Sequence, residues 1–351
     1  MTSGPVSLRQ ASPSDSKLMP LIEVNHLTKI FKTFERKEGV WGGIENLFVR
    51  QYRDLKAVDG ISFSIDRGEM VGYIGANGAG KSTTIKMLTG ILVPSGGEVR
   101  VQEFIPYRDR GAYTRTIGVV FGQRTQLWWD IAVVESFQLL KKIYGVSDRD
   151  YDDRLKTFDE VLDLKPLLHT PVRKLSLGQR MRCDLAASLL HNPTVLFLDE
   201  PTIGLDVVAK ENIRQFLRHI NRDLRVTVLL TTHDLSDIEE LCRRIMIIDK
   251  GKLLFDGALS ELRERLACKS QIKFELKEPQ SVDFTSLRPN SDIEFEQLDG
   301  MHCQVIFDKK LVASADLIKL LVNSLPVRDI VLEDTTIEEI VREIYSRGGI
   351  E

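Results

Sequence analysis

The sequence predicts an α/β fold built on a mostly parallel core sheet, with a smaller α+β domain after it. The first observation is a set of short, continuous apolar runs, which are typical of strands buried on both faces of a parallel sheet. These runs lie at 70–74, 195–198, 226–230 and 245–248. The second is helical spacing of apolar residues at 132–143 and 152–164. The third is a change near residue 260, where alternating, half-buried strand patterns begin.

The other elements follow from local patterns. Apolar and β-rich runs predict strands at 21–24, 61–65 and 117–121. Apolar residues at helical spacing predict a helix over 83–92, and another over 180–190, which Pro193 ends. In the C-terminal domain we expect strands at 271–276, 293–298, 303–307 and 328–332, and helices at 313–323 and 337–346. This order is similar to a ferredoxin-type fold.

Composition places the chain among ordinary globular proteins. Its 351 residues suffice for one large and one smaller domain, and 42% hydrophobic and 28% charged residues are usual for such folds. The net charge of −3 gives no basic field for nucleic acid. No apolar stretch approaches the roughly 20 residues that a membrane-spanning helix needs. Four scattered cysteines without a C-x-x-C pair indicate incidental thiols in a reducing compartment.

A glycine-rich loop between the strand at 70–74 and the helix at 83–92 predicts a nucleoside-triphosphate site. Glycines let successive backbone N–H groups turn inward around phosphate, and the helix N-terminus points its partial positive charge at the same place. Lys81 adds a cation for the outer phosphates, and the Ser82 hydroxyl is placed to ligate Mg²⁺. We expect the nucleotide to contact Gly75, Ala76, Asn77, Gly78, Ala79, Gly80, Lys81, Ser82 and Thr83.

Two further segments complete the expected chemistry. Asp199 and Glu200 end the buried strand at 195–198, where one carboxylate can hold Mg²⁺ and the other can polarise the attacking water. We assign Asp199 to the metal and Glu200 to the water. Ser176 and Gly178 precede a helix, so they offer a second anion site at a helix N-terminus.

Taken in order, these motifs resemble the nucleotide-binding subunit of an ATP-binding cassette (ABC) transporter, over residues about 21–258. The resemblance rests on the phosphate loop, Gln123, Leu175-Ser176-Leu177-Gly178-Gln179, Asp199-Glu200-Pro201-Thr202, Gly204-Leu205-Asp206 and Thr232-His233-Asp234. It implies a P-loop NTPase fold with a RecA-like core and the antiparallel β and α-helical subdomains of ABC proteins. It also implies ATP and Mg²⁺ as cofactors.

The resemblance assigns further roles. Two subunits would pair head to tail, so that ATP lies between the phosphate loop of one and Ser176, Gly178 and Gln179 of the other. His233 would contact the γ-phosphate and position the catalytic water with Glu200, and Asp206 would couple the two sites. Gln123 would sense the γ-phosphate and Mg²⁺, and Phe31 would stack on adenine. The implied catalytic set is Lys81, Gln123, Glu200 and His233, and the metal set is Ser82, Gln123 and Asp199.

Three departures from the family pattern leave alternatives open. Leu177 stands where a glycine is common, so its side chain must point away from phosphate. Gln126 is a second candidate for the sensor beside Gln123. The insertion before Val58 separates Phe31 from the phosphate loop, and Tyr52 is the alternative partner for adenine.

We expect three regions: a disordered leader at 1–20, an ABC ATP-binding domain at 21–258 with an insertion at 34–56, and a small regulatory or dimerisation domain at 259–351. In the insertion, apolar residues from Trp41 to Tyr52 recur at helical spacing with basic residues around them. That pattern fits a helix packed on its own domain, or one that faces a membrane subunit or lipid headgroups.

The expected function is ATP hydrolysis that energises transport through a separate membrane permease. Resemblance favours export systems, and an importer subunit is the alternative. We expect a second copy of the chain as partner, with a heterodimer possible, no nucleic acid, and a peripheral place on the cytoplasmic face of the cell membrane. Trp128 or Trp129 is a candidate for the groove that receives the permease, with core packing as the alternative. The alternative functional hypotheses are a soluble ABC ATPase and a non-hydrolysing binding module.

Overall fold

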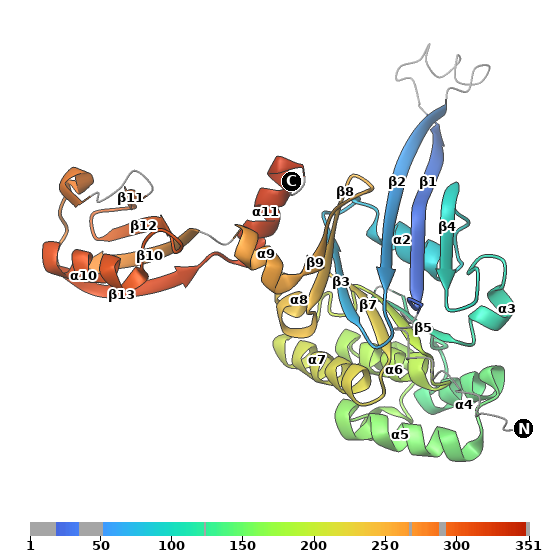
Figure 1. Ribbon diagram of the computed structural model, residues 1–351. Coiled ribbons are helices and arrows are strands. Elements are labelled where there is room, and N and C mark those ends of the chain that lie inside the picture. Colours follow the sequence, from blue (N-terminus) through green and yellow to red (C-terminus); the bar gives the residue numbers. More distant parts are fainter. Residues whose placement is uncertain (1–18, 35–51, 123, 267–268, 288–292, 349–351) are drawn as a thin grey trace, which may run out of the picture.

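The computed structural model describes residues 19–34, 52–122, 124–266, 269–287 and 293–348. Its centre is a six-stranded sheet in the order β5-β6-β7-β3-β8-β9, parallel except for β9 (Figure 1). The strands are β3 (Met70–Gly75), β5 (Ile117–Phe121), β6 (Val195–Asp199), β7 (Thr227–Thr231), β8 (Arg244–Asp249) and β9 (Lys252–Ala258). Nearly every residue of β3, β6, β7 and β8 is buried, as continuous apolar runs predict for a covered parallel sheet.

The register of the parallel strands brings several polar residues to one edge of this sheet. Asp199 lies opposite both Phe121 and Thr231, and Gly75 lies opposite Ile248. Because these strands run in parallel, their carboxyl ends share an edge, and the loops that follow β3, β5, β6 and β7 meet there. In open α/β sheets this is the edge at which ligands bind.

A second, antiparallel sheet has the order β2-β1-β4 and lies beside the core (Figure 1). Its strands are β1 (Ile22–Phe34), β2 (Tyr52–Ile65) and β4 (Gly96–Val101). The helices α2 (Lys81–Leu88) and α3 (Arg110–Tyr113) flank it. Inward side chains of this sheet, such as Ile22 and Val101, share one buried cluster with α2 and with core-sheet residues such as Phe197.

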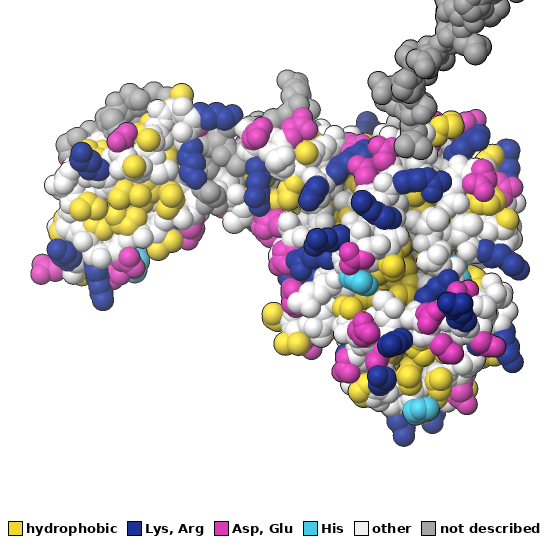
Figure 2. Space-filling model, turned by 60° about the horizontal axis from the view of Figure 1, so that its bottom comes forward, with side chains coloured by type: hydrophobic (Ala, Val, Ile, Leu, Met, Phe, Trp, Pro, Cys, Tyr) yellow, Lys and Arg dark blue, Asp and Glu magenta, His cyan; other side chains and the backbone are white. Residues whose placement is uncertain are grey.

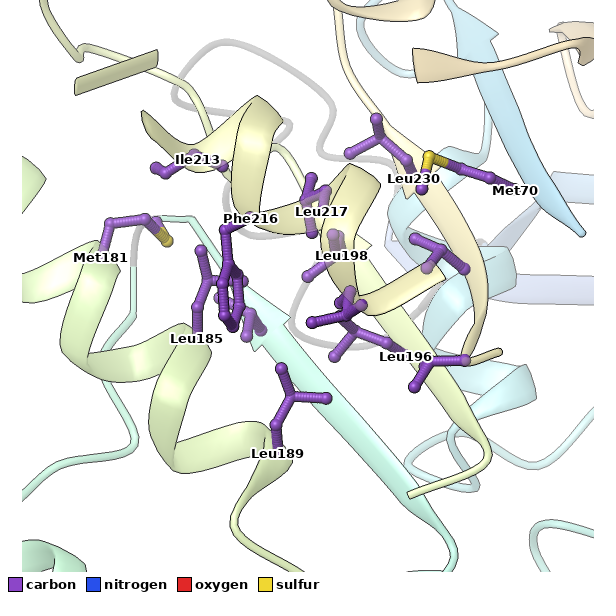
Figure 3. Close-up of a cluster of buried hydrophobic side chains, with 14 of the residues drawn as sticks. Met70, Met181, Leu185, Leu189, Leu196, Leu198, Ile213, Phe216, Leu217 and Leu230 are labelled. Atoms are coloured by element: carbon purple, nitrogen blue, oxygen red, sulfur yellow. The ribbon is translucent and has the colours of Figure 1, made fainter. Parts of the chain in front are cut away.

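Helices cover the other face of the core sheet. They are α6 (Leu177–Leu189), α7 (Val207–Arg222) and α8 (Leu235–Leu241). Outside them, α4 (Val133–Tyr144) and α5 (Asp148–Leu162) pack on α6 and α7, with short 3₁₀ turns at Lys165–Leu167 and Val172–Lys174. Figure 3 shows side chains of α6 and α7 meeting those of β6 and β7, with Phe216 beside Leu185. Phe158 of α5 packs edge-on against Phe216 at 5.7 Å between ring centroids.

The C-terminal part forms a four-stranded antiparallel sheet in the order β11-β12-β10-β13, set to one side of the core (Figure 1). Its elements are β10 (Lys269–Leu276), η3 (Phe284–Leu287), β11 (Glu294–Gln297), β12 (His302–Asp308), α10 (Ser314–Ser324) and β13 (Val327–Asp334). This strand order is that of the expected ferredoxin-type arrangement, with η3 in the place of the first helix. Leu317 and Leu321 of α10 pack on Phe274 and Val305 of the sheet.

The last helix, α11 (Ile337–Arg347), leaves this sheet and returns to α9 (Leu259–Leu266) and α8 (Figure 1). Its apolar residues Ile337, Ile340 and Ile344 are fully buried in the same cluster as the core sheet. The predicted domain boundary between residues 258 and 259 stays a prediction. Within 259–351 the sheet of β10–β13 has its own core, whereas α11 packs on α8, α9 and the core cluster of the six-stranded sheet.

The structure alters the expected N-terminal elements. β1 and β2 are much longer than 21–24 and 61–65, because they pair as a hairpin up to Phe34 and Tyr52. The helical interpretation of the insertion at 34–56 is therefore wrong for 52–56, which are strand. Trp41 and the other apolar residues of that pattern, like the leader up to residue 18, lie outside the described residues. Strands β4 and β9 and helices α3, α7, α8 and α9 were not predicted.

Within the described part of the chain, no helix has both the length and the apolar character that crossing a bilayer requires. The face displayed in Figure 2 mixes basic and acidic side chains, in agreement with the small net charge.

Candidate nucleotide-binding site

The glycine-rich loop joins β3 to α2 as predicted. Gly78 and Gly80 have φ of 82° and 114°, values that L side chains rarely adopt, so the two glycines are required by the backbone path. A Cβ at Gly80 would also lie 2.4 Å from the Ala57 carbonyl oxygen of β2. Gly80 is the N-cap of α2 and no side chain caps this helix. Its first N–H groups are thus available to an anion.

Lys81 lies at the start of α2, and only 5% of its surface is exposed. Its Nζ donates to the carbonyl oxygens of Gly75 at 2.7 Å and Ala76 at 3.3 Å, so it is folded back over the loop. Burial lowers the pKa of Lys81, whereas the carboxylates of Glu200 and Asp199 act in the opposite direction. The buried ammonium group of Lys81 can bind a ligand of high negative charge, and the two carboxylates keep it protonated.

Ser82 and Asp199 lie side by side, although they belong to different elements. The Ser82 hydroxyl donates to Asp199 Oδ1 at 3.1 Å, and the Thr231 hydroxyl donates to the same oxygen at 2.6 Å. Hydroxyl and carboxylate oxygens are the ligands that Mg²⁺ takes in phosphate sites, usually with water and substrate oxygens completing the shell.

Glu200 has a positive φ of 56°, which is uncommon for a residue other than glycine, asparagine or aspartate. The turn is fixed because the Glu200 N–H donates to the Thr231 carbonyl at 3.0 Å and approaches the Thr231 hydroxyl at 3.2 Å. His233 Nδ1 lies 3.2 Å from Glu200 Oε2. A carboxylate held by strained backbone beside an imidazole is an arrangement that can orient a water molecule.

Ser82, Asp199, Glu200 and His233 converge on one cavity of about 620 Å³. It is lined by Asn77, Ser82, Lys86, Ile91, Phe121, Gly122, Arg124, Asp199, Glu200, Ile203 and His233. Its lining thus draws on the loops after β3, β5, β6 and β7, which the register had placed at one edge of the sheet. The donors, the acids and the space fit a magnesium-bound triphosphate.

Ser176, Gly178 and Gln179 lie elsewhere, at the start of α6. The Ser176 hydroxyl accepts from the Gln179 N–H at 3.2 Å, and the Gln179 side chain accepts from the Ser176 N–H at 2.9 Å, which is a reciprocal capping box. Leu177 Cδ2 lies beside Gly204. Asp206 caps α7 by accepting from the Ala209 N–H at 2.8 Å. None of these residues lines the cavity, so the chain presents them on another surface.

Two further predicted residues, Gln123 and Phe31, are not placed at the cavity by the structure. Gln123 is outside the described residues. Phe31 is 37% exposed on β1 and does not line the cavity, but its ring lies 5.3 Å from Lys29 Nζ. Of the alternatives, Gln126 donates its side-chain amide to the Asp184 carbonyl oxygen at 2.8 Å, so it is engaged with α6. Only the backbone of Tyr52, within β2, is described.

Sequence reasoning missed three contributors. Thr231 binds both Asp199 and the Glu200 backbone, and its position directly before Thr232-His233 was the available signal. Arg124 lines the cavity next to the position of Gln123. Gly122 passes so close to Glu200 that a Cβ would lie 2.0 Å from the Glu200 carbonyl oxygen.

Fold and site together define a P-loop nucleoside triphosphatase, with an anion-binding loop, a paired serine and aspartate for a cation, and a glutamate beside a histidine. Comparison with known proteins narrows this class. Residues 58–203 match the family model described as ABC transporter. The chain belongs to the family of ABC transporter ATP-binding proteins, and as a member it is an ATPase.

Named relatives illustrate the match. The chain is 31% identical over 219 residues to the ABC transporter ATP-binding protein NatA of Bacillus subtilis, which covers 61% of this chain and 89% of NatA. It is 32% identical to the bacitracin transport ATP-binding protein BcrA of Bacillus licheniformis, over 62% of this chain and 69% of BcrA. It is 35% identical to the probable multidrug ABC transporter ATP-binding protein YbhF of Escherichia coli, over 62% of this chain but only 37% of YbhF.

Solved structures agree. An ATP-binding subunit of an ABC transporter aligns with a TM-score of 0.58 at 26% identity, covering 70% of this chain and 92% of that one. A dimeric ATP-binding cassette in a post-hydrolysis state with ADP and Pi aligns with a TM-score of 0.56 at 25% identity, covering 68% and 98%. The expected P-loop NTPase fold is thereby confirmed.

Proposed function

We propose that this chain is the ATP-hydrolysing subunit of an exporter, and that it drives a separate membrane permease by closing and opening a head-to-tail dimer. The observation that carries the proposal is the convergence of Ser82, Asp199, Glu200 and His233 on one cavity at the carboxyl edge of the core sheet, with the Lys81 ammonium group folded over the adjacent loop. A non-hydrolysing binding module would have no need of the strained Glu200 turn beside His233.

Each residue has a role that its contacts support. The N–H groups of the loop and the Lys81 ammonium group bind the phosphates. To do so, Lys81 gives up its hydrogen bonds to the Gly75 and Ala76 carbonyl oxygens. Ser82 and Asp199 hold Mg²⁺, which when bound neutralises phosphate charge. Glu200 accepts the proton of the attacking water, and His233 keeps the Glu200 carboxylate and that water in line with the γ-phosphate. Gln123 completes the metal and sensor set as predicted from the sequence.

The surface that carries Ser176, Gly178, Gln179 and Asp206 supports the dimer. These residues lie at helix N-termini, away from the cavity of their own chain. A two-fold arrangement brings the α6 N-terminus of one copy to the phosphate loop of the other. Nucleotide then receives charge-assisted hydrogen bonds from both copies. The dimeric cassette among the solved structures supports this arrangement.

Partner and direction are proposed from two kinds of support. Several relatives are described as export or drug-transport proteins, among them a Nod factor export protein and BcrA. Trp128 and Trp129, on the loop after β5, are 41% and 50% exposed rather than in the core. Exposed tryptophans are frequent anchors of interfaces, so we place the permease here and the chain on the inner face of the cell membrane.

The experiment compares wild type with Glu200→Gln and Lys81→Ala. Glu200→Gln keeps the side-chain shape but removes the base, so we expect turnover to fall by roughly a hundredfold or more while ATP still binds. With saturating MgATP this variant is expected to become dimeric in small-angle scattering. Lys81→Ala is expected to lose nucleotide binding and to stay monomeric.

Wild-type turnover that Glu200→Gln leaves intact would remove Glu200 from the mechanism. A Glu200→Gln variant that binds MgATP and remains monomeric would instead contradict the dimer.

A further inference from the structure

The two residues proposed for activating water come from different strands of the core sheet. Glu200 follows β6 and His233 follows β7, and their side chains meet with His233 Nδ1 3.2 Å from Glu200 Oε2. At the strand ends the two segments are joined, because the Glu200 N–H donates to the Thr231 carbonyl oxygen at 3.0 Å. A single join fixes one point of each segment, so a fixed distance between the two side chains calls for a second join.

The second join lies just beyond the pair. Thr202, two residues after Glu200, donates its hydroxyl to Asp237 Oδ2 at 2.6 Å. Asp237 belongs to the first turn of α8, four residues after His233. Thr202 is 3% exposed and Asp237 is fully buried. Glu200 and His233 therefore lie on a closed ring of chain, which is tied at Thr231 on one side and at Asp237 on the other.

The helix α7 supplies the counter-charge of Asp237. Arg214 Nε donates to Asp237 Oδ1 at 2.8 Å, so the two oxygens of the carboxylate have different partners. The Arg214 side chain is itself only 11% exposed. A buried carboxylate costs free energy unless it is paired and hydrogen-bonded. An apolar side chain would fill this place without that cost, so packing alone does not account for the carboxylate.

The helix α8 is a firm support for this carboxylate. Lys210, also on α7, forms an ion pair with Asp234, the N-cap of α8. On the side toward the sheet, Ile238 is fully buried and packs against Gly72 of β3, where an added Cβ would lie 2.6 Å from Ile238 Cδ1. Because α8 is fixed both on α7 and on the core sheet, it resists a movement of the segment that holds Glu200.

We propose that Asp237 is a positioning residue of the hydrolytic pair: by binding Thr202, it holds the segment after Glu200 against the helix that follows His233, and so keeps the carboxylate beside the imidazole. Neither Asp237 nor Thr202 lines the cavity, so both act on the reaction through the residues that they place. This inference rests on the proposed roles of Glu200 and His233.

The test uses the full-length chain with Thr202→Val, which removes the hydroxyl and keeps the shape, and with Thr202→Ser, which keeps the hydroxyl. One hydrogen bond corresponds to roughly a threefold to tenfold change in an equilibrium constant, so we expect kcat for ATP to fall by at least that factor in Thr202→Val. KM for ATP and Kd for MgADP are expected to stay within about twofold of wild type, because the phosphate loop is unchanged. Thr202→Ser is expected to keep kcat within about twofold of wild type.

The matched control is Thr89→Val. Thr89 is also a buried threonine, 4% exposed, and its hydroxyl donates to the Ile85 carbonyl oxygen at 2.9 Å, at the end of α2. Each valine variant loses one buried hydroxyl bond, so both are expected to unfold at lower urea concentration than wild type. Only Thr202→Val is expected to lower kcat.

Two further measurements follow the second join itself. Amide exchange over residues 232–236 is expected to accelerate in Thr202→Val, and in neither Thr202→Ser nor Thr89→Val. In an Asp237→Ala background, where Thr202 has lost its acceptor, Thr202→Val is expected to lower kcat no further. If Asp237→Ala does not fold, the exchange measurement decides.

A Thr202→Val variant whose kcat and amide exchange match those of Thr89→Val would show that Thr202 only packs, and would overturn the proposal. A Thr202→Ser variant as slow as Thr202→Val would do the same, because the hydroxyl would then not be the group that matters. If Glu200→Gln and His233→Ala left turnover intact, the proposed function would fail instead, and exchange over 232–236 would still decide whether Asp237 holds this loop.

Discussion

At the scale of single residues, backbone constraints shape the site as much as its charged groups do. Glu200 adopts φ of 56°, and Gly122, at the end of the neighbouring strand, passes against its carbonyl oxygen. The Gly122 N–H also donates to the Asp199 carbonyl at 2.8 Å. The two carboxylates therefore depend on a glycine that carries no functional group.

Gly122→Ala is expected to displace the Glu200 turn, because its Cβ would lie 2.0 Å from the Glu200 carbonyl oxygen. We expect at least a tenfold loss of ATP turnover and a loss of roughly 1–3 kcal/mol in the free energy of unfolding. Enzyme assays and denaturant unfolding measure the two effects. Gly111→Ala is the control, because nothing lies within 4 Å of its Cβ. A Gly122→Ala variant with full turnover would contradict this role.

A buried acid supports the segment after the position of Gln123. Asp184 of α6 is 3% exposed, and its carboxylate accepts from the Thr125 hydroxyl at 2.8 Å and the Gln126 N–H at 3.0 Å. Burial raises the pKa of Asp184 to about 6, although these hydrogen bonds act in the opposite direction. The folded state thus holds its proton more tightly than the unfolded state does.

The consequence for stability has a definite sign. A raised pKa in the folded state makes the free energy of unfolding fall as pH rises, and for this group the loss is roughly 1–2 kcal/mol between pH 5 and pH 8. Asp184→Asn keeps an acceptor oxygen and removes the titration. We expect its stability relative to wild type to increase across this range, as measured by urea unfolding at several pH values. A difference that does not vary with pH would contradict the assignment.

At the scale of elements, the pattern of the sequence predicted what local periodicity encodes. Continuous apolar runs predicted β3, β6, β7 and β8 with nearly the bounds that the structure has. The order of the motifs predicted that Ser82 lies near Asp199. The helix α7 was missed although Ile213, Phe216, Leu217 and Ile220 have helical spacing and are fully buried. The extension of β1 and β2 was missed because its polar residues gain strand structure from pairing with each other.

The helix α11 was predicted as an element but not as part of the core of the nucleotide-binding domain. Ile344→Ala is expected to cost roughly 2–4 kcal/mol in the free energy of unfolding, because it leaves a cavity among α8, α9 and the core sheet. Val322→Ala on α10, 55% exposed, is the control and is expected to change stability by less than about 0.5 kcal/mol. Equal effects of the two substitutions in urea unfolding would argue against this packing.

At the scale of the whole molecule, the contacts that matter join segments far apart in the chain, and these are the ones that local patterns do not encode. The partner of Asp199 could be predicted because the motifs have a known order. The packing of α11 on α8 and α9 could not, because an amphipathic helix has no local signal that names its partner. The proposed position of the permease likewise rests on the exposure of Trp128 and Trp129, which the sequence does not encode locally.

Trp128→Ala and Trp129→Ala are expected to weaken assembly with the permease, because both indoles are about half exposed on the loop after β5. Turnover of the isolated chain is expected to stay within about twofold of wild type, since neither indole lines the cavity. Co-purification from membranes measures assembly. Leu311→Ala, on the C-terminal sheet domain and 62% exposed, is the control. If both tryptophan variants assembled normally, the proposed docking position would be wrong.

The strands that begin and end the C-terminal sheet are hydrogen-bonded neighbours, with Ser270 opposite Asp334. The chain therefore enters and leaves this sheet at almost one point, as in an inserted module. Joining the two strands by a tight turn near that point would delete the module and leave α9 and α11 where they are. A stop codon after α9 would instead remove α11 together with the sheet. The phenotype of a C-terminal deletion therefore depends on whether α11 is retained.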